Sequence, residues 1–135
     1  GLIADGFHVA PEVLRLALRL NPQLFLVSDA MSTVGSDLTK FTLNGREIFR
    51  AGGRLTLADG TLAGADIALI DAVRHLHLSL GLPLEQALSL ASAAPAKALG
   101  LRDRGSLLPG MRADFFCLTA DITCGATWIG GRAVA

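Results

Sequence analysis

Several residue types are scarce in this sequence, and each scarcity excludes a class of function. Its 135 residues contain one Trp and no Tyr, so side chains that could stack on nucleic-acid bases are few. Acidic and basic residues balance at a formal net charge of zero, which gives no electrostatic attraction to nucleic acid or to an anionic membrane. No apolar run approaches the ~20 residues of a membrane span. We therefore expect no nucleic-acid partner and no membrane partner.

Cysteine is equally scarce. Cys117 and Cys124 are the two thiols, and their spacing forms no CxxC motif. A reducing, cytoplasmic environment is the expected location for such a chain. What the sequence does have is apolar residues, which make up 51% of it, so one globular unit with a real core is expected.

The first part of the chain reads as strand, helix, strand. Short apolar runs at residues 1–6 and 24–27 predict buried strands, and residues 10–21 predict a helix with Pro11 at its first position. Continuous apolar strands joined by a helix are typical of a parallel sheet covered on both faces. The sequence therefore predicts an α/β fold.

A long excursion follows the second strand. After a loop at residues 29–39, Asn44-Gly45 and Asp59-Gly60 predict the turns of two hairpins, over residues 40–49 and 53–64. Loops of this length at a strand end are generally functional.

The second half predicts helices first and short strands afterwards. Asp66 is the expected cap of a helix over residues 66–81, and two shorter helices follow over 83–92 and 95–100. Short strands are expected over residues 105–118, 121–123 and 126–135.

Asp29 is the first candidate for chemistry, because it directly follows the apolar run 24–27. A carboxylate at the C-terminal end of a buried parallel strand is partly desolvated and stands where α/β proteins place catalytic groups. A turn-forming or capping role fits position alone equally well.

Asp5, Gly6 and His8 occupy the matching end of the first strand. His8 could hydrogen-bond a substrate, move protons or ligate a metal, or it could simply bond to backbone. With Asp29 it makes only two candidate ligands, whereas catalytic zinc has about three protein ligands. His75 and His77 are two residues apart on a helix, so they point to different faces and are expected on or near its surface.

Taken in order, the motifs resemble one family. The segments "LIADGFHV", "LVSDAM", "DGTLAG", "AVRHL", "ASAAPAKALGL", "GSLLPGMRADFFCL" and "WIGGRAV" resemble the C-terminal third of the N-acetylglucosamine-6-phosphate deacetylases of the amidohydrolase superfamily. The resemblance spans essentially the whole chain. Its later segments are shared with many amidohydrolases, whereas the first three narrow the match to the deacetylases.

The resemblance implies a fold. Residues 1–104 are expected to be the last strands and helices of a (β/α)₈ barrel, and residues 105–135 the C-terminal strands of a small β-sandwich. The chain is thus expected to be part of a longer enzyme and to be inactive alone.

The resemblance also implies a site. Asp29 is the expected catalytic acid and base in hydrolysis of the sugar phosphate N-acetylglucosamine 6-phosphate. Two stretches are expected to bind that substrate, the first at Asp5, Gly6, Phe7 and His8, and the second at Leu62, Ala63 and Gly64. A divalent metal, zinc or iron, is expected in the whole enzyme, held by a Glu and two His that precede this chain, so no metal is expected on the chain itself. The whole enzyme is expected to be a homodimer.

Two alternatives stay open. The chain could belong to another amidohydrolase, acting on a cyclic amide or a purine, which an early HxH motif upstream would reveal. It could also be a non-catalytic binding or assembly module that folds as given.

Overall fold

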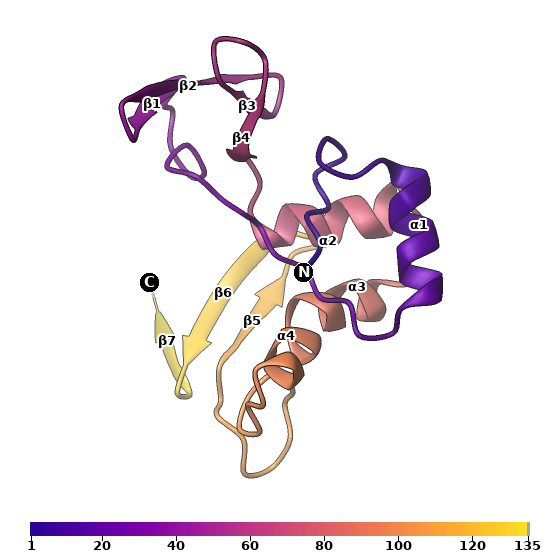
Figure 1. The fold of residues 1–135 in the computed structure, drawn as a ribbon. Helices are drawn as coiled ribbons and strands as arrows, with labels where there is room; N and C mark the ends of the chain where they lie inside the picture. Colours follow the sequence, from indigo (N-terminus) through magenta and orange to yellow (C-terminus); the bar gives the residue numbers. More distant parts are fainter. Residues whose placement is uncertain (135) are drawn as a thin grey trace.

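The computed structural model describes residues 1–134, which form a mixed α/β structure with four helices and two antiparallel sheets (Figure 1). The helices are α1 (Pro11–Leu20), α2 (Leu69–Leu78), α3 (Leu84–Ala91) and α4 (Ala93–Ala98). The first sheet contains β1 (Lys40–Leu43), β2 (Arg46–Ala51), β3 (Arg54–Thr56) and β4 (Leu62–Ala65) in that order. The second contains β5 (Phe115–Leu118), β6 (Cys124–Ile129) and β7 (Arg132–Val134).

The two predicted N-terminal strands pair in parallel, but through a single bridge between Leu2 and Leu26. The Leu2 amide donates to the Phe25 carbonyl at 2.9 Å, and the Val27 amide donates to the Leu2 carbonyl at 3.0 Å. The parallel pairing is therefore confirmed, whereas extended strands over 1–6 and 24–27 are not formed. Between them α1 begins at Pro11, as predicted, because proline lacks an amide hydrogen that the first helical turn would leave unpaired.

Both predicted hairpin turns are confirmed. Leu43 pairs with Arg46, so Asn44 and Gly45 form a two-residue turn, and both have positive φ angles, of 50° and 75°. The turn at Asp59-Gly60 lies between β3 and β4, where the Leu57 amide donates to the Thr61 carbonyl at 2.9 Å. Figure 1 shows the resulting sheet standing away from the helices.

The predicted start of the long helix is wrong. α2 begins at Leu69 rather than at residue 66, and the residue before it is Ala68. The Ala68 amide donates to the Asp71 carboxylate at 3.2 Å, so Asp71 satisfies the helix start in place of Asp66. Asp66 is unavailable as a cap because Thr33 and Arg50 bind its carboxylate.

The predicted strand at 121–123 is also wrong. Ile122 has a left-handed backbone, with φ of 55°, and its side chain is buried. Its carbonyl accepts two hydrogen bonds from the Arg74 guanidinium of α2, at 3.2 and 3.3 Å. This loop therefore connects the C-terminal sheet to the helices, whereas the boundary at residue 104 stays a prediction.

The hydrophobic core lies where the N-terminal segments meet α1, α2 and α3. Its buried members are Ala4, Leu14, Leu26, Ala65, Ile67, Ala72, Val73, Leu76, Ala87 and Ile122. Because Leu26 and Ala65 belong to this core, the loop that follows Leu26 begins at a buried position and β4 ends at one. Among residues 1–134, no helix has both the length and the apolar character needed to cross a membrane.

Candidate functional site

Two of the predicted site segments emerge from the parallel bridge. Residues 5–8 follow the segment of Leu2, and Asp29 follows the segment of Leu26. Because parallel segments run in the same direction, both segments leave the bridge at the same end. The fold thus places the two segments as the sequence predicts, although no hydrogen bond or ion pair joins His8 to Asp29 within residues 1–134.

Residues 5–8 form a tight turn around one carboxylate. Asp5 Oδ1 accepts hydrogen bonds from the Phe7 amide at 2.9 Å and the His8 amide at 3.0 Å. Asp5 Oδ2 lies 2.7 Å from His8 Nδ1. Only 5% of the Asp5 side chain is exposed, against 20% for His8. Burial opposes ionisation of Asp5, but the hydrogen bonds from His8 and Phe7 outweigh it and hold the pKa of Asp5 below its usual value.

The turn is packed from two sides. The Arg54 guanidinium of β3 lies 4.4 Å from the centre of the Phe7 ring, a cation–π contact. A side-chain carbon built on Gly6 would lie 3.6 Å from Nε2 of His75 in α2. Residues 5–8 are therefore packed between β3 and α2.

His75 is half-buried, which fits a position near the helix surface, but its ring turns one nitrogen inward. His75 Nε2 is buried and has no hydrogen-bond partner in the described part of the chain. His77 instead brings Nδ1 within 2.8 Å of the Leu82 carbonyl. The two rings lie on different faces of α2, as their spacing predicts.

Asp29 has an unusual backbone. Its φ is 51°, a left-handed conformation that few residues other than glycine adopt. The Asp29 carbonyl accepts from the Ala65 amide at 2.9 Å, and the Met31 amide donates to the Ala65 carbonyl at 3.2 Å. Asp29 itself is exposed, which differs from the expected partial desolvation. The bridge to Ala65 holds the backbone of Asp29, but its carboxylate faces solvent.

The second predicted binding stretch lies beside the Asp29 loop. Leu62, Ala63 and Gly64 form most of β4 and lead into the bridge at Ala65. Gly64 has a φ of 82°, and a side-chain carbon on it would lie 2.5 Å from Met31 Cγ. Only glycine permits this close approach.

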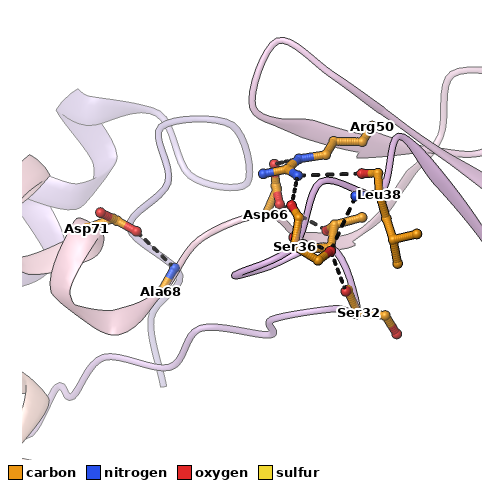
Figure 2. A network of polar contacts seen from close by, with 8 residues as sticks. Ser32, Ser36, Leu38, Arg50, Asp66, Ala68 and Asp71 are labelled. Atoms are coloured by element: carbon orange, nitrogen blue, oxygen red, sulfur yellow. Dashed lines mark hydrogen bonds and ion pairs between the residues drawn. The ribbon is translucent and has the colours of Figure 1, made fainter. Parts of the chain in front are cut away.

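An ion pair joins β2 to the residue that follows β4, and a hydrogen bond from Thr33 extends it to the loop after Asp29; no local motif indicates this network (Figure 2). Arg50 Nε binds Asp66 Oδ2 at 2.6 Å, and the buried Thr33 hydroxyl donates to Asp66 Oδ1 at 2.9 Å. Arg50 Nη1 also donates to the Ser36 carbonyl at 2.7 Å. The Asp66 side chain is only 5% exposed, so these donors take the place of water around its carboxylate.

The site residues do not form a metal centre by themselves. Among residues 1–134, no three or more His, Cys, Asp or Glu side chains gather closely enough to hold a metal ion. A catalytic zinc site has about three protein ligands, so the expected zinc or iron does not fit the residues described here.

Known proteins that resemble this chain in sequence show the family to which it belongs. Residues 56–135 match the model of the amidohydrolase family. An Escherichia coli (strain K12) protein provisionally named an N-acetylgalactosamine-6-phosphate deacetylase is 35% identical over 97% of the chain and 80% of its own length. The chain therefore belongs to the amidohydrolase family.

Within that family the match is to sugar-phosphate deacetylases. The chain is similar to the N-acetylglucosamine-6-phosphate deacetylase of Mus musculus, at 40% identity over 99% of the chain and 34% of the mouse protein. It also superposes on the crystal structure of the Pasteurella multocida N-acetylglucosamine-6-phosphate deacetylase with a TM-score of 0.96, at 31% identity, covering 100% of the chain and 36% of that structure. The resemblance expected from the motifs is confirmed along the whole chain, which spans about a third of the length of the mouse relative.

Proposed function

We propose that the chain is the proton-transferring part of an N-acetylglucosamine-6-phosphate deacetylase. The observation that carries this proposal is Asp29, which leaves the parallel bridge at the same end as residues 5–8 and is tied through Ala65 to β4. The relatives are named as deacetylases, and the Asp29 carboxylate is a group that can transfer the proton which deacetylation requires.

The proposed fold follows the same argument. Residues 1–104 would be the last strands and helices of a (β/α)₈ barrel, and residues 105–135 the C-terminal strands of a β-sandwich. The parallel bridge between Leu2 and Leu26 supports the first part, and the separate sheet of β5, β6 and β7 supports the second.

The chemistry needs one group that moves a proton. In amide hydrolysis, water attacks the acetyl carbon, the carbon–nitrogen bond breaks, and acetate and an amine are released. The nitrogen is a poor leaving group until it is protonated. Asp29 takes the proton from the attacking water and passes it to the nitrogen, so the carboxylate ends the cycle as it began.

Substrate contacts are proposed on both sides of Asp29. His8 offers a ring nitrogen from residues 5–8, and the backbone of Leu62, Ala63 and Gly64 offers polar groups from β4. The ligand is a small N-acetylated sugar phosphate. The zinc or iron implied by the family would be held by a Glu and two His outside this chain. The full-length enzyme is proposed to be a homodimer in the cytoplasm.

Acetate release from the full-length enzyme tests the proposal. We expect wild type to deacetylate N-acetylglucosamine 6-phosphate and Asp29→Asn to lower kcat by about 10²–10⁴-fold, the usual contribution of a positioned acid or base. Asp37→Asn is the matched control, because Asp37 is an exposed carboxylate in the same loop. Its kcat is expected to stay within about twofold of wild type.

An Asp29→Asn enzyme with wild-type kcat would overturn the assigned role. The epimeric substrate, N-acetylgalactosamine 6-phosphate, is assayed in parallel because the Escherichia coli relative carries that name. A higher kcat/KM on that sugar would keep the reaction but change the substrate.

A further inference from the structure

Both carboxylate oxygens of Asp5 are already engaged within its own turn. Its carboxylate accepts three hydrogen bonds, two from the amides of Phe7 and His8 and one from His8 Nδ1. All three donors belong to its own turn. With 5% of its side chain exposed, Asp5 is also shielded from anything outside the turn. This arrangement disagrees with its expected role as a substrate contact.

The same bonds determine the state of the His8 ring. An ionised carboxylate can only accept hydrogen bonds, so the 2.7 Å contact requires a hydrogen on His8 Nδ1. In the neutral ring that leaves Nε2 as an acceptor with a free lone pair. The ring is 20% exposed, so its outer edge is open to a ligand.

We propose that Asp5 is a positioning residue, which holds the His8 ring in the Nδ1-protonated tautomer and presents Nε2 as the substrate-contacting atom of this turn. The proposal rests on the proposed function for the identity of the substrate. It reassigns Asp5 from a residue that touches the substrate to one that acts only through His8.

The chain contains an internal comparison for this role. Asp59-Gly60 repeats the Asp-Gly pair, and Asp59 Oδ1 accepts the Thr61 amide at 2.9 Å, much as Asp5 accepts the Phe7 amide. Asp59 is exposed, and no histidine lies in its turn. A substitution at Asp59 therefore changes a similar turn without touching the proposed device.

Asp5→Asn in the full-length enzyme is the decisive variant. The amide oxygen can still accept the two backbone hydrogens, but its NH₂ group now faces His8 Nδ1 and can only donate. His8 must therefore move its proton to Nε2. We expect kcat/KM to fall about 10–100-fold, as for other partners that orient a ligand-binding histidine. Asp59→Asn should leave kcat/KM within about twofold of wild type.

Nitrogen-15 NMR of histidine-labelled enzyme reads the tautomer directly, with the His8 signals identified by their loss in His8→Gln. We expect a protonated Nδ1 in wild type and a protonated Nε2 in Asp5→Asn. The wild-type spectrum alone tests the assignment if the variant does not fold. An Nε2-protonated His8 in wild type would overturn the proposal.

A double-mutant cycle separates positioning from direct contact. If Asp5 acts only through His8, adding Asp5→Asn to His8→Ala should cost no further kcat/KM. A further loss in that background would show that Asp5 has a role of its own and would overturn the proposal. An enzyme without deacetylase activity, but with the expected tautomers, would reject the proposed function and leave the positioning of His8 in place.

Discussion

The two Asp-Gly pairs, at residues 5–6 and 59–60, show how one dipeptide can serve two purposes. In each pair the carboxylate accepts a backbone amide two residues on, at 2.9 Å, and the glycine has a positive φ, of 77° or 87°. Around Asp59 the turn is open to solvent. Around Asp5 the turn is enclosed, by Arg54 over Phe7 and by His75 against Gly6.

The difference between the two turns lies in what each carboxylate must satisfy. Asp59 accepts the Thr61 amide at an exposed position, where water could accept that hydrogen bond almost as well. The Asp5 side chain is only 5% exposed, so its hydrogen bonds with His8 replace contacts with water, and His8 is a side chain suited to chemistry. The same local geometry is thus a simple hairpin turn at one place and part of a candidate site at the other.

The largest expected difference is in stability on removal of each carboxylate. Asp5→Ala leaves the amide of His8 and the His8 ring without an acceptor in a partly buried place, so we expect a loss of about 2–3 kcal/mol in the free energy of unfolding. Asp59→Ala should shift the urea midpoint of the full-length protein far less, because water replaces the lost acceptor. Equal shifts in the two variants would show that burial does not distinguish the turns.

A smaller effect is expected from the two glycines. Gly6→Ala and Gly60→Ala should each lose about 1–2 kcal/mol, because both force a side chain into the left-handed region. Neither adds a clash, since the contact at Gly6 is an ordinary 3.6 Å and, among residues 1–134, no atom beyond the chain neighbours lies within 4 Å of a side-chain carbon at Gly60. Only Gly6→Ala should also lower kcat/KM, because relief of the backbone strain at residue 6 moves the neighbouring His8. A matching loss of activity in Gly60→Ala would contradict this.

The smallest effect concerns pH. Hydrogen bonds lower the pKa of both Asp5 and Asp59. Burial opposes the effect at Asp5, but the hydrogen bonds from His8 and Phe7 outweigh it, and at Asp59 the largest cause is the hydrogen bond from the Thr61 amide. As the pH falls, these carboxylates therefore become protonated in the unfolded chain at a higher pH than in the folded chain. The stability that each carboxylate supplies above about pH 4 is lost as the pH falls through its pKa in the folded state. Urea midpoints measured between about pH 3 and 6 should vary less in Asp5→Asn than in wild type. An unchanged pH profile would show that Asp5 is not ionised in the folded state.

The candidate site was predictable where local sequence carries it. Asp29 stands at the end of an apolar segment, and Gly64 belongs to a glycine-rich stretch, so both could be found without a structure. Asp66 could not be assigned correctly, because a polar residue before a helix suggests a cap. Its hydrogen-bond partners, Thr33 and Arg50, lie 33 and 16 residues away in the sequence, and no local sequence pattern predicts contacts at that separation.

The role that we propose for Asp5 cannot be deduced from its motif, for a related reason. Its motif points to a binding stretch, but not to which member touches the ligand. That depends on burial and on the direction of each ring, which become visible only when residues 5–8 are packed. His75 is similar, since its position on α2 gives no sign that Nε2 turns toward Gly6.

The sequence by itself determined the local geometry: the start of α1 at Pro11, the hairpin turn at Asn44-Gly45, and the conformational freedom at Gly6 and Gly60. These follow from φ preferences and from hydrogen bonds within a few residues. The tertiary structure decided which of two similar Asp-Gly turns became buried and which carboxylates gained charged partners. The physical reason is that desolvation depends on segments far apart in the chain, and a carboxylate removed from water needs donors that only those segments or a packed turn can supply.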